Sequence, residues 1–196
     1  MSYNPKIHHR RSIRLQGYDY SKAGFYFITL VCYNRKSFFG KIVSDSNQQN
    51  YMKLSSTGLT ARSCWLEIPL HYPNVKLHEF IIMPDHLHGI LEIKEKDDVF
   101  YGECRVKQIN KFQKIIPGSI GSILRGYKIG VTKWFRDKCM MEDWFMIERE
   151  EIVLWQRNYY EHIIRNEQEY FALSKYIKNN PKNWKGVIEY IKDLEI

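Results

Sequence analysis

The chain has 196 residues, of which 44% are hydrophobic and 15% aromatic, so it can bury a domain-sized core and a mainly disordered state is excluded. Lys and Arg outnumber Asp and Glu by 30 to 22, and the resulting net charge of +8 favours an anionic partner, first of all a nucleic acid. The longest apolar run, from Phe25 to Cys32, is far shorter than the roughly 18 residues of a membrane helix, so we expect a cytoplasmic protein with no membrane partner.

Residues 1–24 are polar and basic, and we expect them to form an N-terminal arm. Arg10, Arg11 and Arg14 in this arm are candidate contacts to DNA phosphates, although a solvated tail would carry the same charges. The segment from Phe25 to Tyr33 is rich in β-branched and aromatic residues and apolar at both alternating positions. This pattern predicts a central strand that is covered on both faces.

Two elements are predicted after this strand. A second strand is expected around Phe38 to Val43, and the segment Ser55-Ser56-Thr57 is expected to cap a helix that runs up to Pro69. Two apolar runs follow, at residues 76–83 and 87–93, separated by the turn dipeptide Pro84-Asp85. Because proline cannot donate to a sheet ladder, the two runs predict an antiparallel hairpin.

The middle of the chain divides into a loop and a helix. Residues 94–117 mix charged residues with glycine and proline without a clear period, which predicts a variable loop. From Ser119 onward, apolar residues recur at the spacing of an amphipathic helix. Lys128 and Lys133 on its basic outer face are candidate phosphate contacts, although plain solvation explains that face equally well.

A strand and a capped helix are predicted near the C terminus. Leu154 to Ile164 has the alternation of a strand, and Asn166 with Glu169 three residues later has the pattern of a capping box. Pro181 disfavours helical geometry at the residue before it, so this helix should end near Asn179 or Asn180.

The order strand, helix, strand, strand, helix, strand, helix predicts an α+β fold of the ferredoxin-like (RRM-like) type. In this fold an antiparallel sheet has helices packed on one face, and the other face would be free for a ligand. We expect one domain over residues 25–183, followed by a tail of residues 184–196 that forms a short terminal helix.

One pair of histidines could carry chemistry. His86 and His88 flank Leu87 on the second strand of the predicted hairpin, and the strand period of two directs both imidazoles to one face. Two nitrogen ligands would therefore converge on a divalent ion, although surface or structural histidines have the same spacing. A third ligand should come from another element, and Asn180 is a candidate because it shares a helical stripe with Tyr176.

This arrangement allows a specific reaction. A metal held by His86, His88 and the amide oxygen of Asn180 could polarise a phosphodiester while the Tyr176 hydroxyl attacks phosphorus. The chain has 14 tyrosines, so the spacing alone favours an ordinary half-buried aromatic residue at Tyr176.

Four ordered segments resemble a known family. Residues 80–90, with the sequence FIIMPDHLHGI, resemble the His-hydrophobic-His signature of the single-tyrosine HUH transposases. Residues 155–165 and 176–181 resemble downstream blocks of one branch, the REP-associated tyrosine transposases. Residues 11–20 resemble the N-terminal block of that branch, so the resemblance spans nearly the whole chain.

The resemblance implies a metal-dependent endonuclease and strand transferase that acts on single-stranded DNA with hairpin-forming repeats. Tyr176 matches the nucleophile, which forms a 5′-phosphotyrosine link and releases a 3′-hydroxyl; His86 and His88 match the metal ligands, and Asn180 sits where relatives place an amide. The family uses Mg²⁺ or Mn²⁺. Since imidazole is not a preferred ligand of Mg²⁺, we expect Mn²⁺ to support activity at least as well.

Other functions remain compatible with the sequence. A domesticated protein could bind single-stranded nucleic acid through the same surface without cleaving it. Cleavage that persists without Tyr176 would instead indicate Tyr160 as nucleophile or a water-driven metal nuclease. The sequence allows either a monomer or a homodimer.

Overall fold

The structure is a computed structural model that describes residues 18–95, 116–141, 152–186 and 188–190. Arg10, Arg11 and Arg14 lie outside the described residues, as does most of the loop predicted at 94–117. The roles expected for the basic arm and for this loop therefore stay predictions.

The main sheet has four strands: β1 (Gly24–Val31), β4 (Val75–Met83), β5 (His86–Ile93) and β6 (Tyr160–Ile164). Their spatial order is β4-β5-β1-β6, and every neighbouring pair is antiparallel. Helices α1 and α2 lie between β1 and β4 in the chain, and α3 lies between β5 and β6, so the four strands follow the βαββαβ order of the ferredoxin-like arrangement. The predicted α+β fold class is confirmed.

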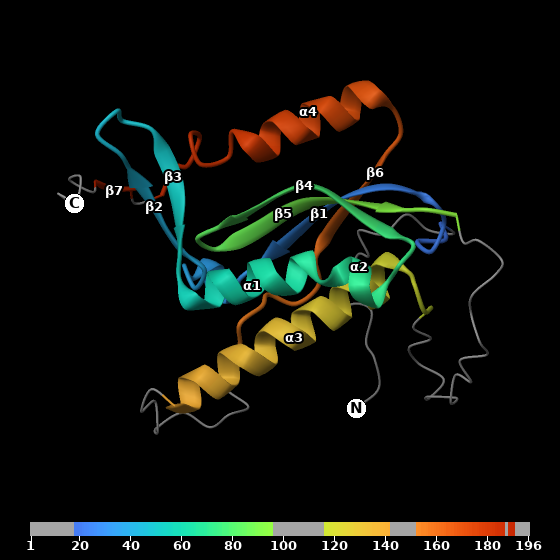
Figure 1. Cartoon of the computed structure of the whole chain (residues 1–196), viewed down its shortest axis with the longest axis horizontal. Coiled ribbons are helices and arrows are strands. Elements are labelled where there is room, and N and C mark those ends of the chain that lie inside the picture. The colour runs from blue at the N-terminus through green and yellow to red at the C-terminus, as the bar shows by residue number, and fades with distance from the viewer. Residues whose placement is uncertain (1–17, 96–115, 142–151, 187, 191–196) are drawn as a thin grey trace, which may run out of the picture.

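Three helices cover one face of this sheet, α1 (Ser56–Leu66), α2 (Ile68–His71) and α3 (Ile120–Met141) (Figure 1). The core between them consists of large buried side chains from both layers. It includes Tyr26, Ile28, Leu30, Trp65, Leu87, Leu91, Ile123, Leu124 and Tyr127. None of the helices in the described ranges is long and apolar enough to cross a membrane.

The first helix ends earlier than predicted. Within the predicted capping segment, Ser55 is the residue that caps α1, because its side chain accepts a hydrogen bond from the Gly58 N–H. The helix stops at Leu66, and α2 begins after Glu67 with Pro69 in its first turn, where the missing proline N–H costs nothing. The proline therefore starts a new helical turn instead of ending the first one.

The last helix, α4 (Glu167–Lys178), covers the other face of the sheet (Figure 1). The Asn166 side chain accepts a hydrogen bond from the Glu169 N–H, and the helix is capped at Asn179, as predicted. A small apolar cluster packs α4 onto the strands; its buried members are Phe27, Ile90, Ile164 and Ile177. This face is therefore not free, because the apolar stripe of α4 needs a partner surface.

The strand predicted at residues 154–164 is shorter than expected. Only β6 is a continuous strand, and Trp155 makes an isolated bridge to Cys32. Asn158 has a φ of 68°, in the left-handed region, and this interrupts the extended backbone between the two.

A second, three-stranded sheet contains β2 (Gly40–Ser44), β3 (Asn50–Leu54) and β7 (Ile188–Tyr190). The terminal helix expected over residues 184–196 is wrong for the described part, because β7 pairs with β2 in parallel. Short apolar patterns do not separate helix from strand, and the open edge of β2 supplies hydrogen-bond partners that an isolated helix would lack.

Candidate active site

Two imidazoles share one face of β5. His86 and His88 are separated by one residue, so the strand period directs both rings to the face that α4 covers. The ring centroids lie 4.5 Å apart, and each residue is only 7% exposed. The ring of Phe27 stacks on His88 at 5.3 Å, which helps to fix its orientation. The two rings are close enough to bind one ion.

Each imidazole also has a second partner. The Nδ1–H of His86 donates to Oδ1 of Asp85 over 2.5 Å, and Nδ1 of His88 is hydrogen-bonded to Oγ1 of Thr29 over 2.9 Å. Histidines that bind metals generally engage their other ring nitrogen in this way, which fixes the tautomer and the ring orientation. Neither of these two hydrogen bonds uses an Nε2 atom, which is the ring nitrogen that could face a ligand.

The electrostatics of the site favour a neutral His88 ring. Burial, together with the nearby charges of His86 and Arg35, lowers the pKa of His88 to about 3. Burial alone would raise the pKa of Asp85, but the hydrogen bond from His86 and the charge of Arg35 lower it. A neutral His88 next to an ionised Asp85 is the state in which imidazole binds a metal.

Tyr176 reaches this pair from α4. Its hydroxyl lies 3.3 Å from Nε2 of His88, and the two rings are 5.2 Å apart. The side chain is 48% exposed, so a substrate can reach the hydroxyl group.

A carboxylate on β4 anchors α4 to the sheet. Glu79 accepts hydrogen bonds from the Tyr170 hydroxyl (3.0 Å) and the Ser174 hydroxyl (3.2 Å), and it forms an ion pair with Lys178 at 3.0 Å. These three residues follow one stripe of the helix. Burial would raise the pKa of Glu79, but the bond from Lys178 and the other donors lower it to about 2. Glu79 therefore helps to position the helix that carries Tyr176.

Asn180 lies in the turn that follows α4, where it is buried. Among the contacts of the described residues, none joins its amide to His86 or His88, so its role as third ligand stays a prediction. The described residues also contain no group of three or more His, Cys, Asp or Glu side chains that could hold a metal ion. The nitrogen donors that the described residues bring together here are the imidazoles of His86 and His88.

Lys128 and Lys133 differ in their surroundings. The Lys128 ammonium donates to the carbonyl oxygens of Gln156 (3.1 Å) and Asn158 (2.6 Å), and burial lowers its pKa to about 8. It thus supports the segment that leads into β6. Lys133 is exposed on the outer face of α3. The contacts of Lys128 and Lys133 with DNA phosphates therefore stay predictions.

Several residues of the site had no assigned role in the sequence. Asp85 could have been found, because a carboxylate next to a candidate ligand is a common second partner. Thr29 could not, since only the register of β1 against β5 places it opposite His88. Trp184 had no assigned role either, and its ring stacks on His86 at 6.2 Å. Tyr160, the alternative nucleophile, is 50% exposed and lies opposite Thr29 on β6.

Two proteins are similar in sequence to most of this chain. An uncharacterized protein of Haemophilus influenzae is 45% identical over 186 residues, which cover 93% of each chain. A second protein of that organism, named a REP-associated tyrosine transposase, is 24% identical over 176 residues, covering 89% of this chain and 79% of its own. No model of a known protein family matches the chain.

A solved structure shares the fold. It is a REP-associated tyrosine transposase bound to a REP hairpin, and it has a TM-score of 0.55 and 20% sequence identity to this chain. The match covers 87% of this chain and 73% of the other. The likeness therefore extends along most of this chain and is not limited to a single motif.

Proposed function

The chain belongs to the family of REP-associated tyrosine transposases, and we propose that it cleaves and rejoins single-stranded DNA through a covalent bond to Tyr176. Membership of this family makes it a transposase-type, DNA-processing enzyme. The observation that carries the finer proposal is the 3.3 Å contact between the Tyr176 hydroxyl and Nε2 of His88, which unites a nucleophile with the histidine pair.

His86 and His88 would hold a divalent ion, Mg²⁺ or Mn²⁺, with the Asn180 amide as third ligand. The fit rests on the chemistry of the donors: both Nδ1 atoms are engaged by Asp85 and Thr29, and the His88 pKa is low. When bound, such an ion supplies positive charge that polarises the scissile phosphodiester.

In the proposed reaction, each bond that Tyr176 forms is matched by a bond that breaks. Its oxygen forms a bond to phosphorus while the bond from phosphorus to the 3′-oxygen of the preceding nucleotide breaks. The phenolic proton is lost to solvent and the leaving 3′-oxygen gains one, which gives a 5′-phosphotyrosine and a free 3′-hydroxyl. In rejoining, a 3′-hydroxyl attacks the same phosphorus and releases Tyr176, so the energy of the ester is conserved.

The proposed substrate is single-stranded DNA that contains hairpin or palindromic repeats. Two observations support it: the solved relative is bound to a REP hairpin, and this chain has a net charge of +8. The half-exposed Tyr176 leaves room for a backbone phosphate to approach the histidine pair.

The test uses hairpin-bearing single strands labelled at either end, incubated with the protein and Mn²⁺. We expect a denaturant-resistant adduct that carries the 3′-end label, while the 5′-labelled fragment is released with a free 3′-hydroxyl. Tyr176→Phe should abolish the adduct, and the control Tyr160→Phe should retain it.

Other outcomes separate the alternatives. Binding without any adduct in the unmodified protein would favour the nucleic-acid-binding protein without cleavage. Cleavage that persists in Tyr176→Phe would indicate Tyr160 or a metal-activated water as nucleophile.

A further inference from the structure

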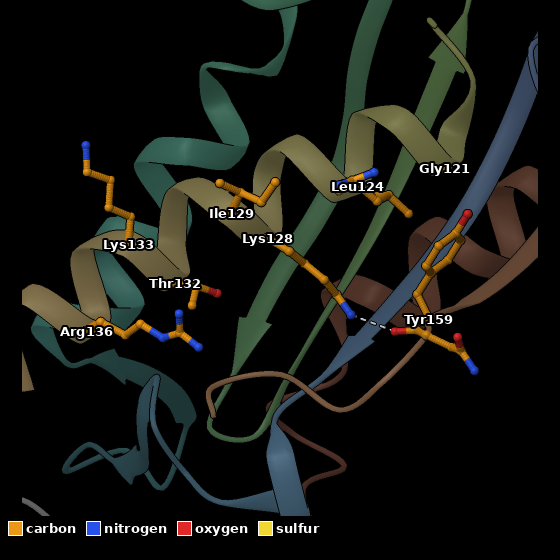
Figure 2. A pocket seen from close by; sticks show the side chains of 10 residues that line it. Gly121, Leu124, Lys128, Ile129, Thr132, Lys133, Arg136 and Tyr159 are labelled. Carbon is orange, nitrogen blue, oxygen red and sulfur yellow. Dashed lines mark hydrogen bonds between the residues drawn. The ribbon is translucent and has the colours of Figure 1, made fainter. Parts of the chain in front are cut away.

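A cavity of about 570 Å³ lies between the outer face of α3 and the segment that precedes β6 (Figure 2). It lies on the side of the sheet that α1 and α3 cover, whereas Tyr176 lies on the side of α4. The proposed chemistry makes no use of this cavity, although its volume is in the range of small-molecule sites.

The cavity has an apolar and aromatic lining. Leu124 and Tyr159 both line the cavity; Leu124 is fully buried, and the partly buried Tyr159 packs against the core. Ile129 also lines the cavity and is 56% exposed, which leaves an aliphatic surface open to solvent. Such a surface next to an aromatic ring suits a flat, partly apolar group such as a nucleobase.

Cationic side chains also line the cavity. We call Arg125, Lys133 and Arg136 the cationic rim; all three line the cavity. Arg125 and Lys133 are exposed, and Arg136 donates its Nε–H to the Ile152 carbonyl over 3.3 Å. No acidic residue lines the cavity in the described part of the chain. The rim therefore provides positive charge for a phosphate next to the apolar lining.

The wall of the cavity near β6 is held in place by Lys128. Its ammonium group reaches the Asn158 carbonyl, as Figure 2 shows, and it lies 5.5 Å from the centre of the Trp155 ring. These contacts fix the backbone just before Tyr159, so the cavity has a supported wall.

The edge strand β6 connects the cavity with the active site. Tyr159 lines the cavity, whereas the next residue, Tyr160, pairs with Thr29, which is bonded to His88. Because β6 is the outer strand of the sheet, one extended strand of DNA can pass over this edge from one face to the other.

We propose that this cavity binds one unpaired nucleotide of the DNA substrate, with its base stacked on Tyr159 and its phosphate on the cationic rim. The proposal rests on the proposed function for the identity of the substrate, and it adds a second contact away from the reacting phosphate. A duplex backbone would use the cations but not the apolar lining, so an unpaired nucleotide fits both parts better.

The experiment measures binding in the Tyr176→Phe protein, so that no cleavage intervenes. Two probes are compared by fluorescence anisotropy with Mn²⁺ present: a DNA hairpin with unpaired flanks, and the same hairpin without flanks. Tyr159→Ala should weaken binding of the flanked probe by about 5- to 100-fold and leave the unflanked probe unchanged. Lys133→Gln should lower the slope of log affinity against log salt by about 1 for the flanked probe.

Controls keep the result interpretable. Lys53→Gln removes an exposed lysine from β3. It should change the affinities for the flanked and the unflanked probe equally, and only by the small amount expected from losing one positive charge. Since Tyr159 packs against the core, the far-ultraviolet spectrum of Tyr159→Ala is checked, and Ile129→Ala, at a more exposed position, should also weaken only the flanked probe.

Two outcomes would overturn the cavity proposal: unchanged affinity of the flanked probe in both Tyr159→Ala and Ile129→Ala, or an equal loss with both probes. Either result is independent of the covalent adduct, which is measured separately in the unmodified protein. Selective loss of flanked binding without any adduct would support the cavity and contradict the proposed chemistry.

Discussion

The Tyr176 hydroxyl and Nε2 of His88 lie 3.3 Å apart, although 88 positions separate the two residues in the chain. The first belongs to α4 and the second to β5, and both are part of one subunit. A second copy of the chain is therefore not needed to bring Tyr176 to the histidine pair.

Asp85 should control the affinity of the site for metal. Because it accepts the Nδ1–H of His86, Asp85→Asn should loosen that ring and lower the affinity for Mn²⁺ by about 10- to 100-fold. Titration calorimetry measures the affinity directly, in the absence of DNA. Glu95→Gln, an exposed carboxylate just beyond the other end of β5, is the matched control and should bind as tightly as the unmodified protein. Equal affinities in both variants would refute the role of Asp85.

The choice of divalent ion should reflect the two imidazole ligands. Adduct formation should stop when the ion is removed with a chelator, and Mn²⁺ should restore it at least as well as Mg²⁺, because imidazole binds the softer ion better. The initial rate of adduct formation across a range of each metal gives the comparison. Restoration by Mg²⁺ but not by Mn²⁺, or full activity in excess chelator, would contradict the assignment of His86 and His88 as ligands.

Glu79 should stabilise the protein in a pH-dependent way. Its pKa is lowered to about 2, so the carboxylate contributes stability that is complete above its ordinary pKa and is lost as the pH falls towards 2. Glu79→Gln should therefore lower the free energy of unfolding by about 1 to 2 kcal/mol near neutral pH. The difference from the unmodified protein should shrink in acid.

Denaturant unfolding at several pH values measures this difference. Because Glu79 anchors the helix that carries Tyr176, the variant should also form the adduct more slowly at neutral pH. A stability difference that stays constant from neutral pH down to about pH 2 would show that the carboxylate charge is not what anchors α4.

Gly89 should be required by the packing beneath β5. A Cβ atom at this position would lie 2.5 Å from Cζ2 of Trp65, whose side chain is fully buried. Gly89→Ala should therefore destabilise the protein by about 1 to 3 kcal/mol. Gly126→Ala in α3 is the control, since its Cβ would meet only the Tyr72 hydroxyl at 3.5 Å and alanine favours helix. Urea midpoints that shift equally in both variants would contradict this account.

The sequence predicted the local features of the site well. Alternation along β5 placed both imidazoles on one face, and Asn166 and Pro181 correctly bounded the helix that carries Tyr176. These features depend on neighbouring residues, so a single sequence contains them.

Features that depend on strand pairing were not predicted. Thr29 meets His88 only because of the register between β1 and β5, and Ile188–Tyr190 becomes a strand only because β2 offers an open edge. The covering of the second face by α4 likewise depends on how its apolar stripe docks onto Phe27 and Ile90. Such long-range partners leave no periodic signal in the chain.

The most direct test of the account locates the DNA on the protein. The adduct is digested with a nuclease and with a protease that cuts after glutamate, and the peptides are analysed by mass spectrometry. Glu161, Glu167 and Glu169 lie between Tyr160 and Tyr176, so the two tyrosines fall in different peptides. We predict that the residual nucleotide is bound to Tyr176 in the peptide that begins at Tyr170. A nucleotide on the peptide of Tyr160, or on neither, would contradict the central claim.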